Sequence, residues 1–333
     1  MGRCNRSYRA ALLSLVLGVL SSSHIMSAFV ISVQRKSSSR VFRNAIAHDD
    51  RRQVSEIMTG SDTVDDSLPA HRIAVLYEDN RILVINKPEG VPHHDGEGEL
   101  GILSILRQFQ ASGKLNYQGR LHGVHRLDRV TSGILMLAKD ADMASTLSQA
   151  FREGTVTKYY VGVSAKRRSK KKQGWVKGNM VRGRRKSWYL TRGDGSDASN
   201  TAVTRFFTAG LTSLWDSAAQ DDALPMTCLL FRPYTGRTHQ LRVAAKSVGM
   251  PLLGDPIYKD GSDSTLSART YLHASAIHVD LDDGPITIWS PPPFHHLWNG
   301  KEGKEAFDAI LVHLMQKHCD CDPILVEMKG RDL

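Results

Sequence analysis

The sequence predicts an α+β protein with a mixed, mostly antiparallel sheet flanked by helices. Short apolar runs typical of strands recur between residues 73 and 289, and amphipathic stretches typical of helices fall between some of them. The two kinds of segment do not follow the strict strand–helix–strand alternation of a parallel sheet. The chain has 333 residues, of which 41% are hydrophobic, so it can form a sizeable core and is not disordered overall.

Strands are predicted where short runs rich in apolar and β-branched side chains are bounded by turn residues. The first two runs flank the turn Glu78-Asp79-Asn80, and the third follows a Thr-Ser-Gly turn at residues 131–133. In chain order, the predicted strands are residues 73–77, 81–85, 134–138, 156–163, 202–207, 227–232, 272–278 and 285–289.

Helices are predicted where apolar side chains recur every three or four residues. Asp140 can cap one of them, because an Asp side chain accepts hydrogen bonds from the free N–H groups of a first helical turn. Met143, Leu147 and Phe151 then share its inner face. In chain order, the predicted helices are residues 103–109, 141–151, 239–248 and 306–318.

Residues 1–47 are predicted to be a targeting leader outside the fold. Three arginines and the apolar run 10–20 have the form of a signal peptide, and the acid-free segment that follows is rich in Ser and Arg, as in transit peptides. This combination resembles the bipartite leaders of algal plastids with extra membranes, so we expect a plastid protein, with a mitochondrial one as the alternative. We expect a linker over 48–71, one catalytic domain over 72–320 and a tail over 321–333, with no membrane segment in the mature form.

The positive charge is concentrated in two segments. The formal net charge is +10, with seven basic residues in the leader and eleven in an insert over residues 166–186, and neither segment has an acid. The rest of the chain has 26 basic and 34 acidic residues. Because Trp175 and Trp188 lie near the ends of the insert, it is suited to contact a nucleic-acid backbone and stack on bases. The alternatives are a solvated flexible insert and a sorting signal.

The four cysteines predict neither a disulfide framework nor a zinc site. Cys4 lies in the leader, Cys228 in an apolar run, and Cys319 and Cys321 form one Cys-x-Cys pair near the C-terminus. We therefore expect reduced thiols.

The loop at residues 122–133 contains the strongest candidate for chemistry. Asp128 lies between Arg126 and Arg129 and precedes a turn that leads into a buried strand. Nearby cations keep a carboxylate ionised, and an ionised carboxylate can act as a covalent nucleophile. The alternative is an ion-paired Asp with a structural role.

Four blocks of sequence resemble those of the RluA-type pseudouridine synthases and follow one another in the order found in that family. Together they cover roughly residues 72–295. The central one is His-Arg-Leu-Asp-x-x-Thr-Ser-Gly at 125–133. The others are Val-Ile-Asn-Lys-Pro-Glu-Gly-Val at 84–91, Thr-Lys-Tyr-Tyr-Val at 157–161, and Pro-Tyr-Thr-Gly-Arg-Thr-His-Gln-Leu-Arg-Val at 233–243, which is followed by Pro-Leu-Leu-Gly-Asp-Pro-Ile-Tyr at 251–258.

The resemblance implies the pseudouridine synthase fold with a central RNA-binding cleft, and isomerisation of specific uridines in structured RNA. It implies Asp128 as the nucleophile that attacks C1′ or C6, Tyr160 as the aromatic side chain that stacks on the uracil and helps to remove the C5 proton, and Arg237 as the cation that holds Asp128 ionised. Because a Tyr is weakly basic near neutral pH, a water molecule or Asp128 is the alternative acceptor of that proton. The expected substrate contacts are Arg126, which would support base flipping, together with Leu241, Arg129 and His125. It implies no cofactor and no metal. We expect a monomer that acts on ribosomal or transfer RNA.

Two other functions fit part of the pattern. The spacing His122-x-x-His125-x-x-Asp128 offers metal-ligand types for a metal-dependent hydrolase, although the flanking arginines oppose a cation. A non-catalytic RNA-binding protein of the same fold is the second alternative.

Overall fold

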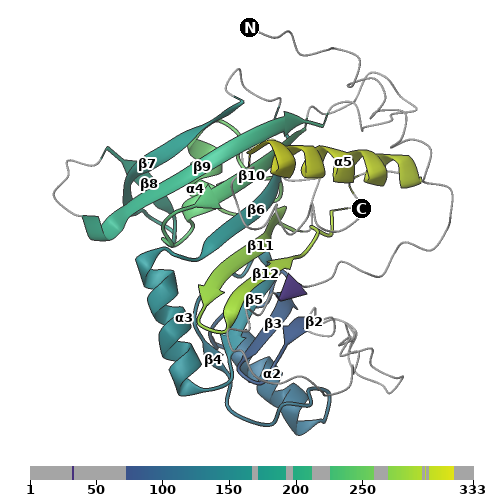
Figure 1. Cartoon of the computed structure of the whole chain (residues 1–333). Coiled ribbons are helices and arrows are strands. Elements are labelled where there is room, and N and C mark those ends of the chain that lie inside the picture. The colour runs from purple at the N-terminus through teal and green to yellow at the C-terminus, as the bar shows by residue number, and fades with distance from the viewer. Residues whose placement is uncertain are drawn as a thin grey trace, which may run out of the picture.

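The computed structural model describes the central part of the chain (Figure 1). The described residues are 32–33, 73–166, 172–192, 198–211, 226–258, 269–294, 297 and 300–318. Most of the predicted leader, the predicted linker and tail, and Cys4, Cys319 and Cys321 lie outside these ranges, so their assignments stay predictions.

The described strands form one 12-stranded sheet with the order β2-β3-β5-β11-β6-β10-β9-β7-β8, with β4 beside β5, β12 beside β11 and β1 beside β12. The β5–β11 pair is parallel and the other described pairs are antiparallel, which confirms the predicted mixed sheet. The strands are β1 (Ser32–Val33), β2 (Ala74–Glu78), β3 (Ile82–Lys87), β4 (His122–Gly123), β5 (Ser132–Ala138), β6 (Thr157–Ser164), β7 (Gln173–Arg182), β8 (Trp188–Thr191), β9 (Thr201–Gly210), β10 (Thr227–Pro233), β11 (Leu272–Leu281) and β12 (Gly284–Trp289).

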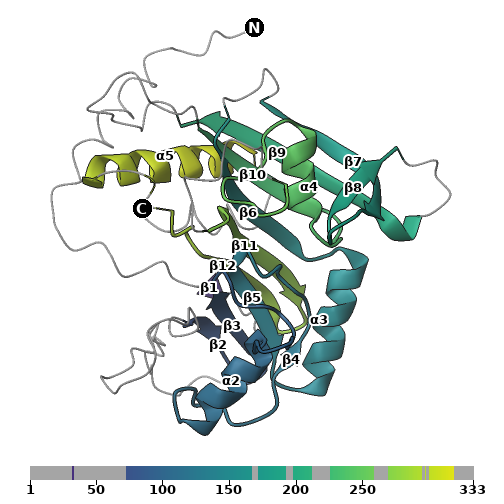
Figure 2. The same cartoon turned by 180° about the vertical axis from the view of Figure 1, so that it is seen from behind.

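The helices lie outside this sheet, and α4 and α5 cover opposite faces of it, as Figures 1 and 2 show from opposite sides. As predicted, Asp140 caps α3 by accepting a hydrogen bond of 2.7 Å from the N–H of Met143. Gly154 ends the same helix in a left-handed conformation, which suits a residue without a Cβ. The helices are α2 (Ile102–Ala111), α3 (Ala141–Glu153), α4 (Gln240–Ser247) and α5 (Gly300–His318), and a short 3₁₀ turn, η2 (Ala198–Asn200), precedes β9.

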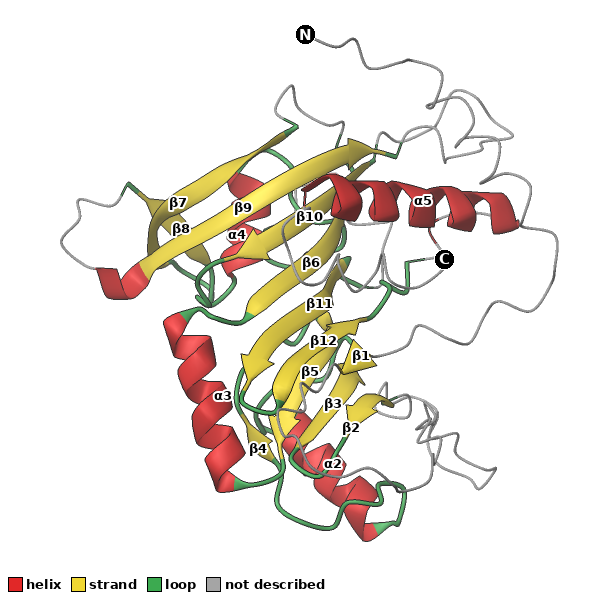
Figure 3. Cartoon of the chain, in the orientation of Figure 1, coloured by secondary structure: helices red, strands yellow, loops and turns green. Residues whose placement is uncertain are grey.

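Alternation along β10 divides the core between the two faces of the sheet. Figure 3 shows α5 on the near side of these strands and α4 on the far side. Leu229 and Phe231 pack with α4, whereas Cys228 and Leu230 pack with α5. Tyr160 on β6 contacts both the α4 core and the larger core that is built on β3 and β5. Tyr160 therefore lies at the centre of the sheet, where these two cores meet. The blocks at 125–133, 157–161 and 233–243 come together there.

The basic insert extends the sheet. Residues 173–182 form β7, which pairs with β9, and β8 folds back on β7 to form the sheet edge. The turn between them contains Arg185 and Lys186 in left-handed conformations. The described part of the insert is therefore a hairpin with a basic tip, which differs from the alternative of a flexible loop.

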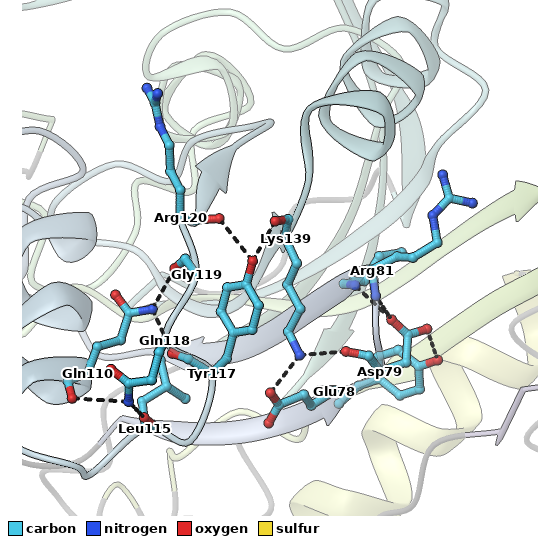
Figure 4. Close-up of polar contacts among 12 residues, drawn as sticks. Glu78, Asp79, Arg81, Gln110, Leu115, Tyr117, Gln118, Gly119, Arg120 and Lys139 are labelled. Atoms are coloured by element: carbon cyan, nitrogen blue, oxygen red, sulfur yellow. Dashed lines mark hydrogen bonds and ion pairs between the residues drawn. The ribbon is translucent and has the colours of Figure 1, made fainter.

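A polar network fixes the segment that leads to the Asp128 loop (Figure 4). Lys139, at the end of β5, donates to Glu78 Oε1 at 2.6 Å and lies 4.7 Å from the ring centre of Tyr117. The hydroxyl of Tyr117 donates to the carbonyl of Lys139 at 2.6 Å, and Gln110 donates to the carbonyls of Tyr117 and Gly119. The loop therefore starts from a position defined by β2, α2 and β5.

Two residues of the predicted leader pair with the sheet. Ser32 and Val33 form β1 and lie opposite Thr287 and Ile286 of β12, whereas we expected the first 47 residues to lie outside the fold. Strand pairing depends on a partner that is distant in sequence, so composition alone does not reveal it. Within the described residues, the structure has no helix that is long and apolar enough to cross a membrane.

Candidate active site

The Asp128 loop is held in place by its Thr-Ser-Gly turn. The N–H of Thr131 donates to the carbonyl of Asp128 at 3.0 Å, which closes the turn. Ser132 accepts a hydrogen bond of 2.9 Å from Arg269 and lies 2.9 Å from Nδ1 of the buried His273. Burial lowers the pKa of His273 to about 3, so this imidazole is neutral.

Gly133 is the residue in this turn that must lack a side chain. Its φ is +110°, and a Cβ there would lie 2.3 Å from the carbonyl oxygen of Ala274. The close approach of backbones lets β5 run parallel to β11 directly after the loop.

Lys87 holds the other side of the loop. Its side chain is fully buried, and Nζ donates to the carbonyls of Pro88 at 2.8 Å, Val91 at 2.9 Å and Arg129 at 3.5 Å. Burial lowers the pKa of Lys87 to about 7. The Lys-Pro motif therefore joins two loops and shapes the site without entering the pocket.

The cation that faces Asp128 is Arg242. Its Nη1 lies 3.6 Å from Asp128 Oδ2, and the two side chains are 3% and 17% exposed. Arg242 also binds Asp255 bidentately, at 2.7 and 2.8 Å. Burial opposes the charge of Arg242, but the hydrogen bonds and charge of Asp255 outweigh it and raise the pKa of Arg242. The guanidinium is therefore charged and fixed in direction.

Arg237 is placed differently from our expectation. It lines the pocket, but its Nε donates to the carbonyl of Thr201 at 3.0 Å, and the cation beside Asp128 is Arg242. The reason is the conformation of the turn. Gln240 accepts the N–H of Arg237 and the hydroxyl of Thr235, and it donates to Val203 and Thr204 on β9. This network directs Arg237 toward β9 and leaves Arg242 beside Asp128.

Tyr160 lines the same pocket from β6, and its neighbour Tyr159 is fully buried on the opposite face, as strand alternation predicted. The pairing of β6 with β11 shifts register between Ala274 and Ala276, directly beside the tyrosine pair. Bulges of this kind re-aim side chains next to active sites. Burial, with a further contribution from Asp128, raises the pKa of Tyr160, so its phenol is neutral.

The pocket has a volume of about 680 Å³, and most of the predicted substrate contacts line it. Arg126 is exposed at its wall and Leu241 is 7% exposed. His125 stacks on Phe151 with ring centres 4.5 Å apart, and its Nε2 accepts the N–H of Met136. Burial lowers the pKa of His125 to about 3.

Arg129 does not belong to this pocket. It binds Glu99 at 2.7 Å and the carbonyl of Gly90 at 3.0 Å, and it is 56% exposed. Asp128 lines the pocket, whereas Arg129, in the turn that follows, fixes the loop after β3. Arg129 therefore lies outside the pocket, and its contact with the substrate stays a prediction.

The pocket contains further groups that we did not single out in the sequence. Lys158 lies on the same strand as Tyr160, two residues away, and its Nζ is 5.4 Å from the ring centre of Phe151. Burial lowers the pKa of Lys158 to about 8. Since residues two apart on a strand share a face, alternation would have found this amine.

His239 begins α4 in a left-handed conformation and also lines the pocket. Its Nδ1 lies 2.9 Å from the hydroxyl of Tyr258, which accepts the N–H of Trp188 at 2.8 Å. The backbone N–H of Tyr258 in turn donates to Asp255 at 3.0 Å. Tyr258 therefore connects the basic hairpin with the Arg242–Asp255 pair, a link that the sequence does not reveal because these segments are distant in the chain.

The side chains of His122, His125 and Asp128, which have the spacing of metal ligands, do not come together in the fold. His122 lines a second cavity, beside Arg107 and Arg120, whereas His125 is engaged with Met136 and Phe151. Among the described residues, no group of three or more His, Cys, Asp or Glu side chains is arranged to hold a metal ion.

Comparisons with known proteins agree with this geometry. The sequence model described as RNA pseudouridylate synthase matches residues 81–247. An uncharacterized RNA pseudouridine synthase from Haemophilus influenzae is 35% identical over 242 residues, which are 73% of this chain and 96% of that protein. The ribosomal large subunit pseudouridine synthase C of Rickettsia typhi is 34% identical over 207 residues, 62% of each chain.

Two solved human structures share the fold. RNA Pseudouridylate Synthase Domain Containing 4 superposes with a TM-score of 0.52 and 26% identity, over 66% of this chain and 88% of that one. RNA Pseudouridylate Synthase Domain Containing 1 gives a TM-score of 0.55 and 24% identity, over 69% and 87%.

Proposed function

Because the chain belongs to the RNA pseudouridylate synthase family and converts uridine in RNA to pseudouridine, we propose that Asp128 is the nucleophile of this reaction. The observation that carries the proposal is the placement of a partly buried carboxylate beside the fixed charge of Arg242 in a pocket that Tyr160 lines. An ionised, positioned carboxylate is suited to covalent catalysis.

In the proposed reaction, Asp128 attacks C1′ or C6 of the target nucleotide, and the N1–C1′ bond breaks. The uracil rotates, a C5–C1′ bond forms, and the C5 proton leaves. Because burial raises the pKa of Tyr160, its phenol stacks on the base as a neutral ring and does not act as a phenolate base. Asp128, once released from the adduct, or a water molecule accepts the C5 proton.

The target uridine must leave its stack to reach Asp128, at a cost of a few kcal/mol. Arg126 supports this step, because it is exposed at the wall of the pocket beside the nucleophile. Leu241 forms an apolar wall for the uracil, and Lys158 places a positive charge inside the pocket. The pocket therefore offers separate groups for the base, the phosphate and the reacting carbon.

We further propose ribosomal RNA as the substrate, because one relative is named for the large ribosomal subunit. The alternative substrate is transfer RNA, and the following test distinguishes the two. RNA transcripts labelled with tritium at C5 of uracil would release the label as the C5–C1′ bond forms. Wild type should release it from ribosomal transcripts, Asp128→Ala should not, and Asp283→Asn, an exposed carboxylate paired with Arg81, should behave as wild type.

Mapping of pseudouridine in cells that lack the gene identifies the site itself. A position that is lost and then restored by wild type, but not by Asp128→Ala, confirms both substrate and nucleophile. Restoration by both versions would refute Asp128 as the nucleophile.

The composition of residues 1–47 supports import into a plastid. A fluorescent fusion of this leader should accumulate in plastids, and a fusion that starts at residue 48 should not. Accumulation in mitochondria would overturn this assignment in favour of the alternative.

A further inference from the structure

An exposed aromatic and cationic strip starts at the rim of the pocket, at the end of β10, and crosses β10, β9 and β7 on the face of the sheet on which α5 packs. It consists of Tyr234, Trp175, Lys177, Arg205 and Arg232. Trp175 and Tyr234 are 48% and 41% exposed, although large aromatic side chains are usually well buried in a folded domain. The exposure of these two rings therefore indicates that this surface binds another molecule.

The geometry of the sheet holds the strip together. Trp175 on β7 lies opposite Arg205 on β9, which lies opposite Arg232 on β10. Residues directly opposite each other share a face of the sheet, so these three side chains form a row. Arg232 lies 5.6 Å from the ring centre of Tyr159, so the row is on the face opposite Tyr160. Tyr234 follows the end of β10, and its ring centre lies 5.2 Å from that of Trp175 at an interplanar angle of 39°.

Each exposed ring has cations close to it. Lys177 Nζ lies 5.0 Å and the Arg205 guanidinium 5.4 Å from the Trp175 ring centre, and Arg232 lies 5.1 Å from that of Tyr234. Surfaces that bind single-stranded nucleic acid combine aromatic rings, on which bases stack, with cations that follow the backbone. A duplex, whose bases are already stacked, cannot use such rings.

Tyr234 connects the strip with the active site around the end of β10, because this residue also lines the pocket that contains Asp128. We propose that this strip binds unpaired nucleotides that flank the target uridine, by stacking their bases on Trp175 and Tyr234. The inference rests on the proposed function, since it makes the strip part of the same RNA site. Its occupant is single-stranded RNA that enters the pocket along the end of β10.

The test compares binding of two labelled probes, a single-stranded decauridylate and a 12-base-pair RNA duplex, to the full chain. Trp175→Ala should weaken binding of the single strand about tenfold, which is within the range for one lost base stack, and leave duplex binding unchanged. Trp175→Phe should retain most of the affinity. Lys177→Gln should flatten the salt dependence of binding, which Trp175→Ala should leave unaltered.

Tyr189→Ala is the matched control. Tyr189 is 49% exposed on the neighbouring strand β8, opposite Val181, about 20 Å along the sheet from Trp175 at about 3.3 Å per residue. Equal losses for Trp175→Ala and Tyr189→Ala, or equal losses for single strand and duplex, would overturn the proposal. Quenching of a 2-aminopurine placed in the single strand, present in wild type and Tyr189→Ala but lost in Trp175→Ala, would support direct stacking.

Turnover separates this inference from the proposed function. With a tritium-labelled RNA substrate, Trp175→Ala should raise KM and leave kcat near wild type, whereas Asp128→Ala should abolish turnover and retain binding of the single strand. A wild-type protein that binds the decauridylate through Trp175 without turnover of any RNA would refute the function and keep the strip. Active enzyme with an unchanged KM in Trp175→Ala would refute the strip and keep the function.

Discussion

The buried pair of Arg242 and Asp255 allows stability and catalysis to be separated by a double-mutant cycle. Both side chains are almost inaccessible, at 3% and 0% exposure, and they make two hydrogen bonds of 2.7 and 2.8 Å. Removing one partner of such a pair leaves an uncompensated buried charge and costs about 3–5 kcal/mol. We expect Arg242→Met and Asp255→Asn each to lose this much stability, which lowers Tm by about 10 °C in a domain of this size.

The double variant should recover part of this loss. Asn at position 255 still accepts the N–H groups of Ile257 and Tyr258, which lie 2.9 and 3.0 Å from Asp255 Oδ1, and no ionised group of the pair then stays buried without its partner. We expect the double variant to be at least about 1–2 kcal/mol more stable than the sum of the single losses predicts. Urea denaturation of the four proteins measures this coupling.

Activity should follow a different pattern from stability. Asp255→Asn keeps the charge of Arg242 beside Asp128 and should retain most of its kcat at a temperature where it is folded. Both variants with Met at position 242 should lose about 100-fold or more, because fixed charge at a reacting group contributes on this scale. Additive stability losses would refute the buried-pair argument, and an active double variant would refute Arg242 as the cation that supports Asp128.

Four further outcomes follow from individual contacts. Because the pKa of Lys158 is lowered to about 8, its charge is lost as pH rises through 8, and KM for RNA should rise between pH 7 and 9 in wild type. Lys158→Met should have a high KM at every pH in this range, and a rise in KM with pH in that variant like that of wild type would contradict the assignment. Tyr258→Phe should keep the fold, by circular dichroism, but weaken RNA binding through the hairpin; unchanged affinity would show that its hydroxyl does not matter. Gly133→Ala should cost about 3 kcal/mol or more in urea denaturation, since its Cβ would clash with Ala274 and its φ is +110°, whereas Gly96→Ala, which has open space, should cost less than about 1 kcal/mol. Replacing the basic residues of the hairpin tip at 182–186 by Gln should weaken RNA binding and flatten its salt dependence with the core still folded; binding that is unchanged at every salt concentration would contradict a contact with RNA.

The sequence predicted the central sheet well because its strands have strong local signals. Cys228 lies in such an apolar run, and it is buried on β10 as expected. The opposite orientations of Tyr159 and Tyr160 followed from alternation alone. Asp140 and its helix followed from capping chemistry. These features depend on residues within a few positions of one another.

The features that the sequence could not predict depend on distant partners. The matched block contains two arginines, Arg237 and Arg242, and the resemblance implied Arg237. The choice is made by Asp255, thirteen residues beyond Arg242, and by Gln240, which directs Arg237 toward β9. Similarly, β7 contains two glycines and a lysine, and it becomes a strand because β9 offers it a partner along its length.

The same long-range contacts give the basic insert its place in the site. Trp188 at the start of β8 donates its N–H to Tyr258, whose hydroxyl meets His239 and whose own N–H binds Asp255. Asp255 holds Arg242, and Arg242 faces Asp128. The contacts from Trp188 to Arg242 are each 3.0 Å or shorter, so they form an unbroken connection between the hairpin and the cation beside the nucleophile. A flexible basic loop would lack this connection, so the folding of the insert into the sheet is what links the hairpin to Arg242 beside the nucleophile.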